Sequence, residues 1–247
     1  FDQQYYDGFM WDRTQYDFSD TVVYTDNLLH TVDSRVKNKI AWLLEPKVIS
    51  PHIYEWIAYN DNKFDSVWTH NNAIIKNNPK YKYVPCCGSW IYKEDHKMYE
   101  KTKLLSIIAS GKKITYGHNL RHNIINTYSN KIDGLFGNGY NPIEYKLEGL
   151  KDYMFSFIIE NGKYDYYFTE KLIDSFVTGT VPIYWGCPSI GNFFDIEGMI
   201  IIKDVDNLDK IIKKLDNKLY NKMLPHIENN FNISKNYLLP ELWMLKN

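Results

Sequence analysis

The chain has 247 residues, of which 29 are Lys or Arg and 30 are Asp or Glu, and its formal net charge is −1. This balance argues against a protein that holds nucleic acid through a broad positive field. The cysteines, Cys86, Cys87 and Cys187, match neither a disulfide framework nor a metal-ligand spacing.

No apolar run approaches the roughly 20 residues needed to span a bilayer, and no signal-peptide pattern occurs. With the odd cysteine count, this favours a soluble protein of a reducing, cytoplasmic compartment, without a transmembrane segment. Because the sequence begins at Phe1, an N-terminal anchor or a fused domain outside it stays open.

The first part of the chain alternates short strands with helices. The first 20 residues lack periodicity and are expected to be an irregular lead-in packed by its aromatic side chains. The pattern predicts strands at residues 21–25, 39–44, 66–69 and 83–86, and helices at 52–59 and 72–77. Such alternation implies a parallel sheet and an α/β class.

The second part repeats this pattern after a highly charged stretch, 93–103, which is expected to be a connecting helix. The expected strands are 104–110, 154–159, 181–185 and 199–202, and the expected helices are 120–128, one after Thr169, and 207–215. From Asp216 an amphipathic helical region follows, interrupted by Pro225 and Pro240. We therefore expect an N-terminal lobe at 1–103, a C-terminal lobe at 104–230 and a helical tail at 231–247.

Residues 154–188 carry most of the functional information. The apolar run 154–159 indicates a strand buried on both faces, and residues 160–162 turn it. Thr169 is a plausible N-cap for a helix whose first turn displays Glu170 and Lys171. A buried strand that leads to a helix N-terminus is typical of sites for phosphorylated ligands.

This region resembles the donor-binding region of glycosyltransferase family 10, the α1,3/4-fucosyltransferases. The matching residues are Glu160–Asn161 after Phe155 or Phe157, then Tyr167, Thr169–Glu170–Lys171, Gly179–Thr180, Pro182 and Gly186. Weaker similarity includes residues 116–128 and 134–146, so the resemblance covers roughly residues 104–215, and more faintly 44–46.

The resemblance implies a GT-B fold, with two Rossmann-like lobes facing a cleft, and here the N-terminal lobe is small. It also implies an inverting, metal-independent transfer of L-fucose from GDP-fucose to a glycan hydroxyl, with no cofactor. The partners would be a nucleotide-sugar donor and a glycan or oligosaccharide acceptor, without nucleic acid. The short first lobe leaves the acceptor identity open.

The transfer needs positive charge for the departing diphosphate, which without a metal comes from Arg, Lys and helix N-termini. By resemblance, Lys171 and Arg121 would bind the phosphates, and Glu170 would accept from the ribose hydroxyls. The competing interpretation is a solvated surface charge for the two cations, and a helix-dipole contact for Glu170.

Three further residues are candidates for donor binding. Asn161 would donate to a phosphate or to fucose, Tyr167 would bond a phosphate oxygen or stack, and His118 would approach the diphosphate. The alternatives are ordinary turn chemistry for Asn161, packing against a strand for Tyr167 and a helix-face position for His118.

The catalytic base is expected from the first lobe. Glu45 follows an apolar strand, precedes Pro46 and resembles the family's catalytic Glu in position. The alternative is an exposed strand-end carboxylate. Asp65, Glu55 and His70 are lesser candidates.

No metal site is expected. Residues 204–206 have the D-x-D form of Mn²⁺-binding glycosyltransferases, but between a strand and a helix they are expected to cap the helix. His118 and His122 lack a third ligand. Two rival functions stay open: a GT-B transferase that uses another nucleotide sugar, and a non-catalytic module that binds a glycan or a nucleotide.

Overall fold

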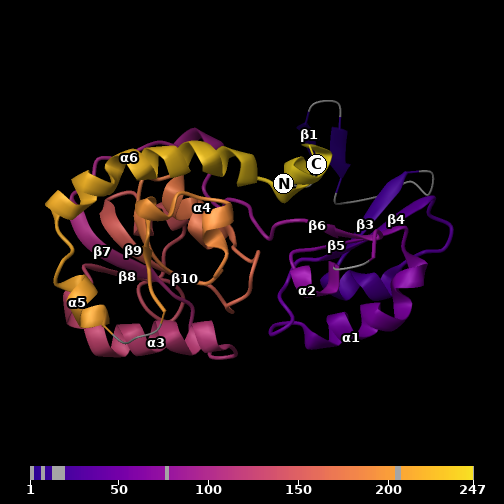
Figure 1. Ribbon diagram of the computed structural model, residues 1–247, viewed down its shortest axis with the longest axis horizontal. Coiled ribbons are helices and arrows are strands. Elements are labelled where there is room, and N and C mark those ends of the chain that lie inside the picture. The colour runs from indigo at the N-terminus through magenta and orange to yellow at the C-terminus, as the bar shows by residue number, and fades with distance from the viewer. Residues whose placement is uncertain (1–2, 7–8, 13–19, 76–77, 204–206, 247) are drawn as a thin grey trace. The chain divides into compact units, whose positions relative to one another are not determined.

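The computed structural model describes residues 3–6, 9–12, 20–75, 78–203 and 207–246. The chain divides into two compact units, the first formed by Phe1–Cys86 with Glu241–Asn247, and the second by Cys87–Pro240. Both units contain a parallel sheet with helices between its strands, which confirms the α/β class (Figure 1).

The first unit contains a four-stranded parallel sheet in the order β3-β4-β5-β6. Its strands are β3 (Thr21–Thr25), β4 (Asn38–Leu43), β5 (Ser66–Thr69) and β6 (Tyr81–Tyr83). Its helices are α1 (Pro51–Asn60), α2 (Asn72–Ile75), α7 (Pro240–Lys246) and the 3-10 turns η1 (Asp26–Thr31) and η2 (Asp61–Lys63). Leu43, Ile53 and Val67 are fully buried between sheet and helices.

Two expectations for this unit are wrong. The first 20 residues contain an antiparallel pair, β1 (Gln3–Tyr6) and β2 (Phe9–Asp12), rather than an irregular lead-in. The signals were the aromatic residues of both segments and the Asp7-Gly8 dipeptide between them, which is typical of hairpins. The strand expected at 83–86 is β6, which lies earlier, at Tyr81–Tyr83.

The second unit contains a five-stranded parallel sheet in the order β11-β10-β9-β7-β8. Its strands are β7 (Lys103–Ile108), β8 (Gly134–Phe136), β9 (Tyr153–Ile159), β10 (Val181–Trp185) and β11 (Ile200–Ile201). Its helices are α3 (Tyr116–Tyr128), α4 (Glu170–Phe176), α5 (Leu208–Ile212) and α6 (Asn217–Ser234). Figure 1 shows α3 on one side of this sheet and α6 on the other.

Short 3-10 segments complete the second unit. They are η3 (Lys93–Asp95), η4 (Ser129–Lys131), η5 (Lys146–Gly149), η6 (Ile190–Asn192), η7 (Ile196–Gly198) and η8 (Lys235–Tyr237).

The strand order of the second unit creates a switch point between β7 and β9. From β7 the chain passes through α3 to β8 at one edge, and then returns to β9 on the opposite side of β7. The connections that leave β7 and β9 therefore diverge, which opens a crevice outside the carboxyl ends of these strands. Ligands of open α/β sheets bind in such crevices.

Two expectations for the second unit are also wrong. Residues 93–103 form only the short η3 before β7, because the chain is tethered to the end of α4 by bonds such as Lys97 N to Val177 O, 3.0 Å. Pro225 does not interrupt α6. It lies on the exposed side of the helix, where water can satisfy the Asn221 carbonyl that lacks its usual partner, while Ile227 is buried on the inner side.

Lys101 ties together segments that are distant in sequence. Its Nζ lies within hydrogen-bond distance of the carbonyl oxygens of Leu150, Lys151 and Thr178, at 3.3, 3.0 and 2.7 Å, and of Thr180 Oγ1 at 2.9 Å. We expect Lys101→Met to lower the free energy of unfolding by roughly 2–3 kcal/mol, because buried carbonyls lose their donor. Lys131→Met, which removes an exposed ion pair with Asp209, is the control and should change it by less than about 1 kcal/mol.

The loss should also depend on pH. Burial lowers the pKa of Lys101 to about 7, and the charge of Asp152 opposes this. Between pH 7 and the ordinary lysine pKa the unfolded chain therefore binds the extra proton, so the stability of the wild-type protein rises with pH. Denaturant unfolding should show a larger deficit for Lys101→Met at pH 9 than at pH 7, and a deficit that shrinks would contradict this.

Gly117, in the first turn of α3, packs directly against the end of β9. A Cβ there would lie 1.8 Å from the Glu160 carbonyl oxygen, and Gly117 N donates to Asn161 O at 3.4 Å. Gly117→Ala should force α3 away from β9 and cost roughly 1–3 kcal/mol. Gly111→Ala, whose Cβ would only make an ordinary contact with Asn138 O at 3.6 Å, is the matched control. Equal melting temperatures for the two variants would refute the prediction.

Candidate functional site

A cavity of about 320 Å³ opens at the switch point of the second unit. Its walls come from the ends of β7, β8 and β9, at Ile108–Ser110, Gly137–Asn138 and Phe157–Ile159. Charged side chains also line it: Arg121 of α3, Glu144 just before η5, Lys146 of η5, and Glu170 and Lys171 of α4. An apolar wall with a few convergent charges is the usual composition of a ligand site.

The Glu160 carboxylate fixes the start of α4 at one side of this cavity. Glu160 directly follows β9 and is fully buried. Its Oε1 accepts from Thr169 N at 2.9 Å and its Oε2 from Thr169 Oγ1 at 2.7 Å. Thr169 in turn caps α4, accepting from Lys171 N. Thr169 is therefore confirmed as the N-cap expected from the sequence. The carboxylate of Glu160, which belongs to the same motif, orients Thr169.

The first turn of α4 holds a coupled group of charges. Lys171 Nζ lies 3.1 Å from Glu170 Oε1, 3.1 Å from Thr169 Oγ1 and 3.7 Å from Glu160 Oε2. Burial would raise the pKa of Glu170, but the ammonium groups of Lys171 and Lys146 hold it at about 2. Burial opposes the charge of Lys171, yet the two carboxylates raise its pKa. Both groups are therefore ionised at neutral pH.

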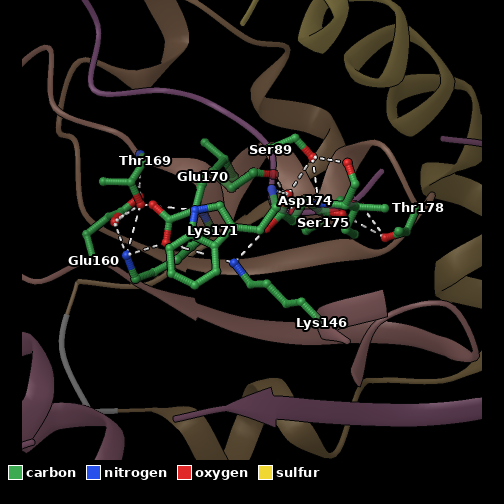
Figure 2. A network of polar contacts seen from close by, with 12 residues as sticks. Ser89, Lys146, Glu160, Thr169, Glu170, Lys171, Asp174, Ser175 and Thr178 are labelled. Atoms are coloured by element: carbon green, nitrogen blue, oxygen red, sulfur yellow. Dashed lines mark hydrogen bonds and ion pairs between the residues drawn. The ribbon is translucent and has the colours of Figure 1, made fainter. Parts of the chain in front are cut away.

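A second carboxylate on α4 organises the other side of the network (Figure 2). Asp174 is fully buried, and its Oδ2 forms a 2.6 Å ion pair with Lys146 Nζ. Its Oδ1 accepts from Ser89 Oγ at 2.7 Å and from Trp90 N at 2.9 Å. The Lys146 ammonium also lies 5.4 Å from the centre of the Trp90 ring, which lines the cavity.

Arg121 reaches the cavity from α3 and is held by the turn after β9. Its Nε donates to Ile159 O at 3.1 Å, and its Nη2 donates to Asn161 Oδ1 at 2.7 Å. A guanidinium has five N–H donors in one plane, so two bonds fix the plane and leave it able to bind a further anion. In this structure the amide oxygen of Asn161 therefore positions Arg121.

His118 lies in the first turn of α3 as part of its cap. Thr115 Oγ1 accepts from His118 N at 3.2 Å, and Thr115 N donates to His118 Nδ1, also at 3.2 Å. Burial, together with the charges of Arg121, Lys112, Lys171 and His122, lowers the pKa of His118 to about 4. The ring is neutral at pH 7, and because Nδ1 accepts, Nε2 carries the proton.

Tyr167 and the α4 backbone amides are more enclosed than the sequence suggested. The Tyr167 side chain is 1% exposed and meets Tyr164 edge to face at 6.0 Å. The amides of Lys171 and Leu172 already donate to Thr169, to its Oγ1 at 3.4 Å and its carbonyl at 3.1 Å. The charge available to a ligand at this end of α4 is thus the Lys171 ammonium rather than these amides.

Glu45, the expected base, belongs to the first unit, where it follows β4. Its side chain is exposed, but its backbone is fixed on both sides: Glu45 N donates to Asp26 Oδ1 at 3.3 Å, and Tyr54 Oη donates to Glu45 O at 3.0 Å. Burial raises the pKa of Asp26 to about 6. The described geometry therefore gives Glu45 a fixed backbone and an accessible carboxylate.

The first unit also contains the three lesser candidates for the base, Glu55, Asp65 and His70. Glu55 is exposed on α1, and Asp65 accepts from Lys39 N at 2.7 Å. His70 follows β5, is 2% exposed, and burial lowers its pKa to about 4. A neutral, enclosed imidazole is a poor acceptor of a proton from an outside substrate.

Among the residues that the structure describes, no group of three or more His, Cys, Asp or Glu side chains is arranged to hold a metal ion. The D-x-D segment at 204–206 lies outside those residues. His122 contacts Tyr140 Oη and Lys112 O, so its partners are accounted for within the fold. The described helices also include none with the length and apolar character to cross a membrane.

The structure thus gathers Arg121, Asn161, Glu170 and Lys171 around one end of the sheet, with His118 and Tyr167 enclosed nearby. Sequence reasoning assigned no site role to Glu160, Lys146, Asp174 or Trp90. One available signal was Asp174 itself, a carboxylate among the apolar residues of α4, since a buried charge requires a partner.

Comparisons with known proteins show which family this chain resembles. The family model described as glycosyltransferase family 10 (fucosyltransferase) C-term matches residues 98–226. The α-(1,3)-fucosyltransferase FucT of Helicobacter pylori is 39% identical over 74 residues, 30% of this chain and 15% of that protein. A putative fucosyltransferase-like protein of Arabidopsis thaliana is 35% identical over 71 residues, 28% of this chain and 14% of its own length. These alignments span about a seventh of the curated relatives.

Solved structures extend the similarity to the fold of nearly the whole chain. An α1,3-fucosyltransferase with GDP aligns with a TM-score of 0.58 at 19% identity, covering 95% of this chain and 80% of that one. The same kind of enzyme with GDP-fucose gives 0.54 at 21% identity, covering 85% and 75%. At such identities the likeness concerns the fold alone, and it confirms the expected GT-B type. Because the family model matches more than half of the residues, the chain belongs to glycosyltransferase family 10, the fucosyltransferase family.

Proposed function

We propose that this chain is an inverting fucosyltransferase that moves L-fucose from GDP-β-L-fucose to a hydroxyl of a glycan. The observation that carries the proposal is the meeting of Arg121, Glu170 and Lys171 at the switch-point cavity, within the matched family region. Solved relatives of the same fold are α1,3-fucosyltransferases with GDP and with GDP-fucose.

In the proposed reaction the oxygen of the acceptor hydroxyl attacks the anomeric carbon of fucose, opposite to the leaving group. The bond from that carbon to the β-phosphate oxygen breaks, GDP leaves with the electron pair, and the hydroxyl proton passes to a base. One displacement of this kind inverts the anomeric centre from β to α. The protein must stabilise the charge on GDP and accept one proton.

Arg121 and Lys171 are the groups that we assign to the diphosphate. Both line the cavity, both are cationic, and they approach from α3 and α4 respectively. Arg121 is held in place by Ile159 and Asn161, so its remaining donors are already oriented toward an anion. The neutral His118 ring, with a proton on Nε2, would add a hydrogen-bond donor rather than a charge.

Glu170 is the group that we assign to the ribose. It is ionised, lines the cavity and carries two carboxylate oxygens, which suits bonds from a pair of adjacent hydroxyls. The apolar wall beside it, which includes Ile108, Phe157 and the Trp90 ring, suits a nucleobase. Burial lowers the pKa of Arg121, and the charges of Glu160, Tyr167 and Glu170 oppose this, so the enclosed Tyr167 would support the Arg121 side chain.

Glu45 remains our proposed base. An exposed carboxylate on a fixed backbone at the carboxyl end of a parallel strand can accept the hydroxyl proton. We propose a metal-independent mechanism because the two cations above can balance the diphosphate without a divalent ion. No cofactor is then required beyond the donor itself.

The choice of donor is the first testable point. Calorimetric titration with GDP, UDP and ADP should show the tightest binding for GDP. Incubation with GDP-fucose and a panel of acceptor sugars should give a product heavier by one deoxyhexose, read by mass spectrometry. Tighter binding of UDP would reject the fucose assignment and favour another nucleotide sugar.

The metal-independent mechanism is tested with EDTA. Activity that survives EDTA would support this mechanism, and loss of activity would reject it.

The role of Lys171 predicts a loss of affinity for the phosphates. Lys171→Met should weaken GDP binding by roughly tenfold to a hundredfold, because a charge-assisted contact to the diphosphate is lost. Lys163→Met removes an exposed lysine from the same β9–α4 connection and is the matched control. If both variants bind GDP equally well, Lys171 does not contact the phosphates.

The role of Glu45 predicts a loss of turnover without a loss of donor binding. Glu45→Gln keeps the size of the side chain but removes its basicity, so kcat should fall by roughly a hundredfold or more at unchanged affinity for GDP. Glu228→Gln, at an exposed position of α6, is the control. GDP-fucose binding with no turnover in the wild-type protein would instead favour a non-catalytic binding module.

A further inference from the structure

Glu170 has two ammonium neighbours that come from different elements. Lys171 Nζ, on α4 itself, lies 3.1 Å from Glu170 Oε1, and Lys146 Nζ, at the start of η5, lies 3.9 Å from the same oxygen. Figure 2 shows both lysines joined to this network. The carboxylate is thus shared, and its two partners are held in very different ways.

Lys146 is fixed by a buried carboxylate. Its Nζ is 2.6 Å from Asp174 Oδ2, its side chain is 16% exposed, and Asp174 has no exposed surface. Asp174 is itself held by Ser89 Oγ and Trp90 N, which both donate to its other oxygen. A buried charge with such partners keeps one geometry, because leaving it would strand a desolvated ion.

Lys171, in contrast, divides its ammonium among several weak or moderate contacts. Thr169 Oγ1 and Glu170 Oε1 are each 3.1 Å from its Nζ, and Glu160 Oε2 is 3.7 Å away. A diphosphate that entered the cavity would attract this ammonium more strongly than one carboxylate can. Glu170 would then lose its nearer cation at the moment when it must accept from the ribose.

We propose that Lys146, held by Asp174, is a positioning residue that keeps the Glu170 carboxylate charged and in place for the ribose hydroxyls while Lys171 engages the phosphates. This inference rests on the proposed function, since it assigns the two lysines separate tasks at the same donor site. It predicts that Lys146 matters only for ligands that carry ribose hydroxyls.

The test compares GDP with 2′,3′-dideoxy-GDP, which retains the base and the diphosphate but lacks both ribose hydroxyls. Lys146→Gln removes the charge while its amide can still donate to Asp174. Calorimetry should show about a tenfold loss of GDP affinity for Lys146→Gln and less than about a twofold loss for the dideoxy nucleotide. Lys146→Arg, which restores the charge, should recover GDP binding. Lys131→Gln, at an exposed ion pair with Asp209, is the control and should bind both nucleotides as the wild-type protein does.

A second variant tests the same inference in case Lys146→Gln does not fold. Asp174→Asn retains the volume of the side chain but removes the charge that fixes Lys146, and it should show the same selective loss for GDP. Equal losses for both nucleotides, or no loss for either, would overturn the inference. The proposed function fails separately: it is rejected if the wild-type protein prefers UDP to GDP, whatever the Lys146 variants do.

Discussion

The site depends on one buried carboxylate. Glu160 ends the central strand β9 and binds Thr169 through both of its oxygens, so it fixes the point at which α4 begins. Burial raises the pKa of Glu160, and the ammonium of Lys171 opposes this. Its surroundings admit only glycine at two places: a Cβ at Gly117 would meet the Glu160 carbonyl at 1.8 Å, and one at Gly186 would meet its Cγ at 2.6 Å. Glu160 therefore links the end of β9 to the start of α4, the helix that carries the cavity residues Glu170 and Lys171.

The alternation of strands and helices was sufficient to predict the parallel sheets, and strands at 21–25, 66–69 and 181–185 have the expected bounds. Buried apolar runs specify such strands locally. The connections were less predictable, because they depend on distant partners: residues 93–103 follow the end of α4 rather than their own helical propensity. Pro225 shows the same limit, since packing of the buried face outweighs one missing backbone bond.

The site residues also differ in whether a local sequence motif could identify them. Arg121, Glu170 and Lys171 lie in the region that the family model matches, and all three line the cavity. Lys146 and Asp174 are 28 positions apart and belong to no shared local pattern, so only the fold reveals their 2.6 Å ion pair. Asn161 was expected to donate to the ligand; its amide oxygen accepts from Arg121, a contact that the motif did not reveal. A motif thus identifies the chemistry of a site more readily than the partners that orient it.

The charges of the network have a consequence for ligand binding. Arg121, Lys146 and Lys171 carry three positive charges, and Glu160, Glu170 and Asp174 offset them with three carboxylates. Lys171, one of the two cations that we assign to the diphosphate, is therefore already paired with carboxylates before a ligand binds. In the binding that we propose, Lys171 exchanges partners: it turns from Glu170 toward a phosphate, while Asp174 keeps Lys146 in place. The balance favours ligands that satisfy both members of the broken pair, an anion for Lys171 and hydroxyl donors for Glu170. A nucleoside diphosphate meets both conditions, whereas inorganic pyrophosphate would leave Glu170 without a new partner.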